Sequence, residues 1–347
     1  MSILGFTPAV AAGSAYEPQD YGIFGDDESI TGRVIVTPDG YSQILSAASG
    51  CFDPRWTANH FVAGLGGLNG SVTTGTGGGC AFPNGGNPTP ETWPDVGYSG
   101  VDGALRFGAV ADPDNPARKA FLYRMRQGDG TDSTGSHRVE ISLGNTYIPT
   151  PKLWRGRRFM SAFSVRIPEA WRSIVPPDEH LLWQIHDTGD VGDDAAQNPN
   201  VSLIQFGGPG GDPSQSRLSW MFRTSADPVT RKADYINTRY DDFDWPGDTW
   251  IHYAMDMVMH WDASQGPYFR IWRALGDSGP IELFVDHTGP NQYNNVQDDY
   301  VKCGLYYYAN AYSAGITDRV VHNKGLHLWR YKPGMTPERL IAFSRGI

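Results

Sequence analysis

Cysteines, basic residues and long apolar runs are all scarce in this sequence. Its 347 residues include three cysteines, and 28 lysines and arginines stand against 38 aspartates and glutamates. No stretch approaches the roughly 20 apolar residues of a membrane span, so no membrane insertion is expected. The formal net charge of −10 excludes a generally basic nucleic-acid-binding protein. With 42 glycines and 25 prolines, a helical bundle is excluded as well. Three cysteines allow at most one internal disulfide, for which Cys51 and Cys80 are the plausible pair.

The N-terminal part of the chain differs in pattern from the rest. Residues 1–44 show no sustained hydrophobic period and predict an extension or attachment arm, whereas residues 45–347 predict one domain. Residues 1–15 lack the basic leader of a signal peptide and contain Pro8. The composition, rich in glycine, asparagine, threonine and aromatic residues, is nevertheless typical of an extracellular or virion protein. We therefore expect an extracellular or virion-associated protein, whose residues 1–44 contact other virion or assembly proteins.

Strand-like runs at short spacing dominate the chain from residue 104 onward. Glycine, proline, aspartate and asparagine separate them, a pattern that predicts an all-β sandwich or jelly roll. One short helix is expected near the C-terminus, where Thr336 can cap, Pro337 suits the first helical position and Glu338 favours the positive end. The expected strands are residues 104–110, 120–125, 138–142, 159–167, 181–186, 201–206, 218–222, 250–261, 268–272, 281–285, 300–308 and 325–331.

Three of these strands alternate an apolar face with an unusual polar one. Successive strand side chains point to opposite faces, so residues of equal parity share a face. Leu181, Trp183 and Ile185 are expected on one face of their strand, opposite Gln184 and His186. An ordinary solvent face is richer in Thr, Ser, Lys and Glu, whereas these side chains are types that bind anions and move protons. The polar set comprises Arg138, Glu140, Ser142, Gln184, His186, Tyr300, Lys302 and Tyr306.

Three short motifs carry a resemblance to a known family. Arg138-Val-Glu140, Gln184-Ile-His186 and Tyr300-Val-Lys302-Cys-Gly304-Leu-Tyr306, in that order, resemble the signature strands of the jelly-roll polysaccharide lyases, which include alginate lyases, glucuronan lyases and heparin lyase I. The resemblance spans about residues 103–329. It implies a β-jelly roll sandwich of the concanavalin A-like type and β-elimination on an acidic, uronic-acid-containing polysaccharide, as in a phage or capsule depolymerase.

The resemblance also implies roles for individual residues. Arg138 and Gln184 would neutralise the uronate carboxylate, and His186 and Tyr306 would form the proton-transfer pair, with either residue able to take the first step. Substrate-binding roles are expected for Glu140, Lys302, Tyr300 and Tyr308, with Glu140 orienting Arg138. Alginate lyases usually carry a further Arg where this chain has Ser142, which weakens the case for alginate as the substrate.

Two other classes of function compete with a lyase. A non-catalytic jelly-roll carbohydrate-binding protein, such as an adhesin or virion spike module, would not need the pair of His186 and Tyr306. A glycoside hydrolase would need two carboxylates that flank the bond, and Glu140 has no obvious partner. No cofactor is required and no catalytic metal is expected, although the acidic loop at residues 187–194 leaves a structural calcium ion as an alternative.

Overall fold

Strands are the main regular structure of the described chain. The computed structural model describes residues 33–36, 62–63, 98–99, 104–127, 137–143, 153, 155–175, 179–187, 198–228, 235–295, 299–307, 317–331 and 334–345. The strands are β1 (Arg33–Val36), β2 (Val62–Ala63), β3 (Tyr98–Ser99), β4 (Leu105–Ala111), β5 (Lys119–Arg126), β6 (His137–Leu143), β7 (Arg158–Arg166), β8 (Glu179–His186), β9 (Val201–Phe206), β10 (Arg217–Thr224), β11 (Ile236–Asp242), β12 (Trp250–Val258), β13 (Tyr268–Leu275), β14 (Glu282–Thr288), β15 (Tyr300–Tyr307) and β16 (Asp318–Arg330).

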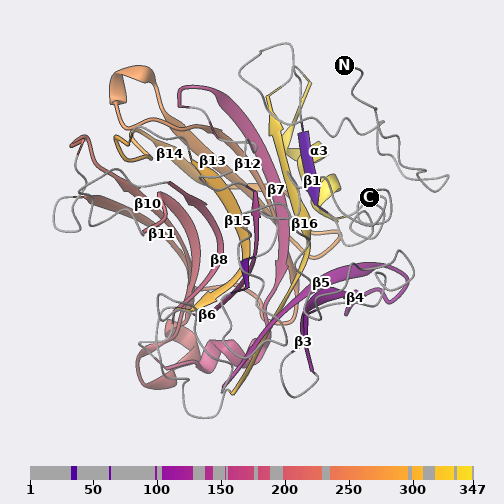
Figure 1. The fold of residues 1–347 in the computed structure, drawn as a ribbon. Helices are drawn as coiled ribbons and strands as arrows, with labels where there is room; N and C mark the ends of the chain where they lie inside the picture. Colours follow the sequence, from indigo (N-terminus) through magenta and orange to yellow (C-terminus); the bar gives the residue numbers. More distant parts are fainter. Residues whose placement is uncertain are drawn as a thin grey trace, which may run out of the picture.

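The strands form two curved antiparallel sheets that stack on one another (Figure 1). Within the described ranges, one sheet has nine strands in the order β14-β13-β12-β7-β16-β5-β4-β3, with β1 pairing β16 as well. The other has seven strands in the order β11-β10-β9-β8-β15-β6-β2. This arrangement is the predicted jelly-roll sandwich. Within the described ranges, no helix is both long and apolar enough to cross a membrane.

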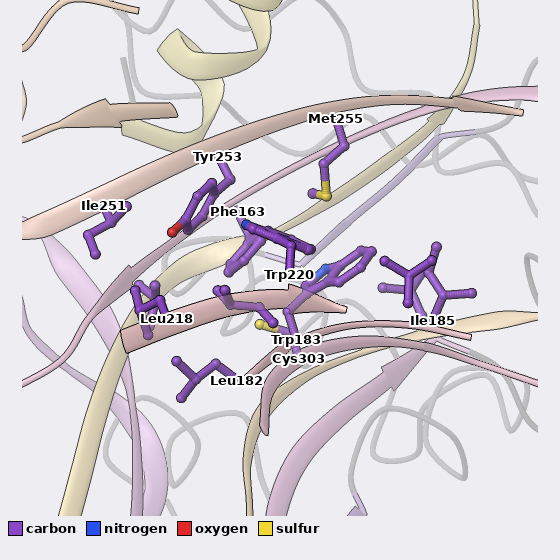
Figure 2. Packing of buried hydrophobic residues seen from close by; sticks show 14 of the residues in the cluster. Phe163, Leu182, Trp183, Ile185, Leu218, Trp220, Ile251, Tyr253, Met255 and Cys303 are labelled. Atoms are coloured by element: carbon purple, nitrogen blue, oxygen red, sulfur yellow. The ribbon is translucent and has the colours of Figure 1, made fainter. Parts of the chain in front are cut away.

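Aromatic and aliphatic side chains fill the space between the two sheets. Trp183 of β8 stacks on Phe163 of β7, with ring centroids 5.8 Å apart, and meets Trp220 of β10 edge to face at 5.4 Å. Figure 2 shows these rings together with Tyr253 and Cys303 between the strands of the two sheets. Burial of large aromatic rings supplies much of the stability of such a core. The inner residues of the seven-stranded sheet are therefore tightly fixed.

The short C-terminal helix is confirmed as α3 (Pro337–Arg345). The Thr336 hydroxyl accepts a hydrogen bond from the Arg339 backbone amide at 3.3 Å, as expected of a helix cap. Leu340, Ile341 and Phe343 pack on residues of the nine-stranded sheet, namely Met160, Ala162, Ala254 and Ala274. The helix thus covers the face of that sheet that is turned away from the core.

Two parts of the sequence prediction need comment. The strand β11 was missed, because most of its side chains are polar, only one is buried, and its sequence lacks the apolar alternation that signals a strand. Four residues of the expected N-terminal extension, Arg33–Val36, form β1 on β16. The boundary between residues 44 and 45, and both Cys51 and Cys80, lie outside the described residues.

Candidate active site

The three motif strands lie next to one another at one side of the seven-stranded sheet, in the order β8-β15-β6. Tyr300 pairs with His186, Lys302 pairs with Gln184, and Tyr306 pairs with Arg138. Directly opposed residues share a face of a sheet. Their neighbours along the chain, such as Trp183, Val301 and Leu305, belong to the core between the sheets. The outer face, defined as the face turned away from that core, therefore carries Glu140, Gln184, His186, Tyr300, Lys302 and Tyr306.

A buried carboxylate holds the amide of Gln184. Gln184 Nε2 donates a hydrogen bond to Glu140 Oε1 at 2.5 Å, and both side chains are about 3% exposed. Among the contacts of the described residues, Glu140 Oε2 has no hydrogen-bond partner although it is buried. Burial raises the pKa of the Cys303 thiol beneath, and the charge of Glu140 raises it further. Glu140 thus holds the amide of Gln184 in place, and its expected contact with Arg138 stays a prediction, because the Arg138 side chain lies outside the described part of the structure.

The hydrogen bonds of His186 determine which of its ring nitrogens carries a proton. His186 Nδ1 lies 2.6 Å from the backbone carbonyl oxygen of Asp187 and 3.6 Å from Oδ1 of the same residue. A carbonyl oxygen only accepts, so Nδ1 must donate. In the neutral imidazole the lone pair then lies on Nε2. His186 therefore has the tautomer that can remove a proton through Nε2.

Tyr300 and Lys302 border His186 on the adjacent strand. The rings of His186 and Tyr300 stack with centroids 5.6 Å apart, and Lys302 Nζ lies 5.3 Å from the centroid of the Tyr300 ring. Lys302 is 5% exposed, so its ammonium acts in a region of low dielectric, where its field is stronger than in water. Lys302 therefore brings a positive charge to the Tyr300 ring that stacks on His186.

The residue next to Tyr306 anchors its strand in the core. Tyr307 is fully buried and stacks on His180 with centroids 5.3 Å apart, while the Arg319 guanidinium lies 4.4 Å from the Tyr307 ring. Tyr306, by alternation, is on the outer face and half-buried. The buried stack under β15 therefore supports the half-buried phenol above it.

Register shifts under the site explain one error of the parity argument. The pairing of β8 with β9 shifts between Leu181 and Trp183, and that of β15 with β8 shifts between Cys303 and Tyr306. Leu181 consequently pairs with Tyr306 and is missing from the core cluster that holds Leu182 and Trp183. It was predicted on the face of Trp183, and the β-bulge at Leu182 reverses that alternation.

Gly304 is the residue that lets β15 and β6 approach so closely. Its φ is +152°, and a Cβ atom there would lie 2.3 Å from the Val139 carbonyl oxygen and 2.6 Å from the Glu140 Cα. Only glycine fits such a position without displacing backbone. The close approach of the β6 backbone thus explains why the Tyr-x-Lys-x-Gly-x-Tyr motif has a glycine at this position.

Some predicted site residues lie outside the described part of the chain. Tyr308 and residues 188–197 are not described, and for Arg138 the backbone register is described but the side chain is not. Among the residues that are described, no group of three or more His, Cys, Asp or Glu side chains could hold a metal ion. The structural calcium ion, which was an alternative for the loop at residues 187–194, stays untested for residues 188–194.

Sequence reasoning missed the group behind His186. Asp187 is 2% exposed, and its Oδ2 accepts a short hydrogen bond from Nδ2 of Asn295. An aspartate that directly follows a candidate base was visible in the sequence, but Asn295 lies 108 residues away and enters only through the fold. Asp187 was counted among the acidic residues of the loop, whereas its carboxylate is already engaged by Asn295 and faces His186.

Comparisons with solved structures find polysaccharide lyases and a neurotoxin binding domain among the similar chains, all at low sequence identity. An endo-β-1,4-glucuronan lyase from the fungus Trichoderma reesei matches with a TM-score of 0.46 and 14% identity, over 65% of this chain and 87% of that one. A marine alginate lyase from Zobellia galactanivorans matches with a TM-score of 0.43 and 14% identity, over 79% of this chain and 96% of that one. The binding domain of botulinum neurotoxin serotype C1 matches with a TM-score of 0.40 and 11% identity, over 70% of this chain and 46% of that one. No protein-family model and no curated protein sequence matches the chain. The chemistry therefore has to be argued from the side chains.

Proposed function

We propose that the protein is a polysaccharide lyase that cleaves an acidic, uronic-acid-containing polysaccharide by β-elimination. The observation that carries this proposal is the placement of His186, Gln184 and Tyr306 on one face, with the proton of the imidazole held on Nδ1. A site that only binds sugar does not need a base and an acid in addition to amide and cationic groups. The non-catalytic carbohydrate-binding function is therefore the second candidate.

The first chemical step is removal of the C5 proton of a uronate. That proton is weakly acidic, so negative charge must be stabilised on the carboxylate as the C–H bond breaks. We assign this stabilisation to Arg138 and Gln184, with Lys302 as a further cation. His186 Nε2 takes the proton as general base.

The second chemical step expels the sugar at C4. The electron pair of the broken C5–H bond forms a C4=C5 double bond, and the C4–O4 bond breaks as Tyr306 gives its phenolic proton to O4. The products are an unsaturated uronate and a fragment with a new hydroxyl group. Proton transfer from the imidazolium to the phenolate, directly or through water, restores both groups. The reaction thus needs no metal or redox cofactor.

The outer face extends across the strands on both sides of β8. One row of paired residues crosses six strands and consists of Ser142, Lys302, Gln184, Ser202, Met221 and Arg239. Lys302 and Arg239 stand four strands apart in this row, which corresponds to roughly 19 Å at the usual strand spacing of about 4.8 Å. Cations at both positions favour a polyanion that runs across the strands. Attachment of residues 1–44 to a virion and an extracellular location stay predictions.

The test is ultraviolet absorbance of the unsaturated product while the protein acts on alginates, glucuronans, glycosaminoglycans and bacterial capsules. Tyr306→Phe should lower kcat by about 10²- to 10⁴-fold, because it removes the general acid, with unchanged circular dichroism. The matched control is Tyr268→Phe, which removes a hydroxyl that donates to Asp256 on the nine-stranded sheet and should keep wild-type activity. Turnover that survives in Tyr306→Phe would refute the role of Tyr306. Binding of a polymer without any product would favour the carbohydrate-binding protein.

A further inference from the structure

We propose that Asp187 is a positioning residue that raises the basicity of His186, and that Asn295 and Arg155 hold Asp187 in place. This inference rests on the proposed function, because it treats His186 Nε2 as the group that removes the proton. It adds a role for Asp187, a residue that none of the three signature motifs contains.

The backbone and the side chain of Asp187 act on His186 in different ways. The carbonyl oxygen, 2.6 Å from Nδ1, fixes the tautomer, and no substitution at position 187 removes it. The carboxylate oxygen Oδ1, 3.6 Å from Nδ1, contributes negative charge. A carboxylate within that distance favours the protonated imidazole and so strengthens the base. Replacing the carboxylate by an amide therefore changes the charge and leaves the tautomer in place.

The carboxylate of Asp187 is held from behind by a chain of short hydrogen bonds. Asn295 Nδ2 donates to Asp187 Oδ2, and Arg155 Nη2 donates to the backbone carbonyl oxygen of Asn295. Asp187 and Asn295 are both almost fully buried. A fixed, desolvated carboxylate exerts a stronger field on its neighbour than an exposed one. The arrangement therefore presents one charge to His186 in one orientation.

Cations around His186 oppose its protonation and make this carboxylate necessary. Lys302 lies beside Tyr300, whose ring stacks on His186, and Arg155 lies behind Asn295. Both would lower the basicity of the imidazole. On the strands near His186, the other charged groups and histidines are His137, Arg138 and Glu140 on β6, Glu179 and His180 on β8, and Arg217 and Arg223 on β10. Asp187 supplies the negative charge on the side of Nδ1, so the site keeps cations for the anionic substrate together with a basic histidine.

The decisive measurement is the pKa of His186 from the pH titration of its imidazole signals by NMR, with the signals assigned by their loss in His186→Gln. Asp187→Asn should lower this pKa by about one unit or more. Asp256→Asn is the matched control, because Asp256 is also buried but binds Arg158 on the nine-stranded sheet, and it should leave the pKa of His186 unchanged. Asn295→Ala, which removes the side-chain donor to Asp187, should give a smaller decrease and serves if Asp187→Asn does not fold.

The second readout is the pH profile of kcat/KM on a polymer that the wild-type protein cleaves. A general base must be unprotonated, so activity is lost as the pH falls below its pKa, and a lower pKa moves that limb to lower pH. In Asp187→Asn, the acidic limb should move to lower pH by the same number of pH units as the pKa of His186 falls in the NMR titration. The variant should also have a lower kcat and an unchanged KM. The proposal would be overturned if the pKa of His186 in Asp187→Asn equals that of the wild-type protein. It would also be overturned if that pKa falls but the acidic limb of the kcat/KM profile stays in place. A wild-type protein that cleaves no polymer would refute the proposed function alone, because the NMR titration still tests the link between Asp187 and His186.

Discussion

Gly304→Ala tests whether the close approach of β15 and β6 is steric. The substitution meets two costs, a non-glycine residue at φ +152° and a Cβ atom within 2.3–2.6 Å of the β6 backbone. The first costs about 1–3 kcal/mol and the second about 1–3 kcal/mol, so we expect a loss of about 2–6 kcal/mol in the free energy of unfolding. Chemical denaturation followed by fluorescence measures it. Separation of β6 from β15 would also draw Glu140 away from Gln184, so activity should fall as well.

Gly289→Ala is the matched control for this prediction. Gly289 has a φ of +123°, and a Cβ atom there would meet no atom within 4 Å. This variant therefore meets the conformational cost alone, and the gain from a stiffer unfolded chain, about 0.4–1 kcal/mol, is the same in both variants. The difference between the two isolates the contact with Val139 and Glu140. A Gly304→Ala protein as stable as Gly289→Ala would refute the steric explanation.

Three further predictions concern stability and positioning. Burial, aided by the charge of Arg166, lowers the pKa of His322 to about 4, which is below its value in the unfolded chain. The free energy of unfolding should therefore be highest above about pH 6.5 and fall by about 3 kcal/mol as the pH drops to about 4. Denaturation curves of His322→Gln should show a weaker pH dependence. Lys324 Nζ lies 3.3 Å from the buried Asp112 Oδ2, so Lys324→Met should cost about 3–5 kcal/mol, and a change near zero in the same assay would contradict this. Glu140→Gln keeps an acceptor for Gln184 and should retain more activity in the product assay than Glu140→Leu, with equal losses counting against the role of Glu140.

The alternation of strand side chains was sufficient to predict one face of the candidate site. Gln184 and His186 do share a face, and the register brings Lys302 and Tyr300 opposite them, as the common polar parity of the motifs indicated. The same argument failed for Leu181, because a β-bulge adds a residue to the strand and no local pattern announces it.

The partners of the site residues were harder to predict than the residues themselves. The hydrogen bond between Gln184 and Glu140 was not predicted, because it depends on β15 lying between their two strands. Asn295 reaches Asp187 across 108 residues of chain. Such contacts follow from the order of strands in a sheet, and that order is set by packing over the whole chain.

The position of the two last strands within the sheets has a consequence for how the protein folds during its synthesis. β15 lies between β8 and β6 in one sheet, and β16 lies between β7 and β5 in the other. Until both strands have left the ribosome, each sheet exists as two separate halves with unpaired edges. The site is completed by the same event, because β15 brings Tyr300, Lys302 and Tyr306 to the residues that are already in place. A nascent chain that ends before β15 therefore lacks the residues of the candidate site that β15 carries and is prone to associate through its open edges, and the site is completed when the last two strands insert.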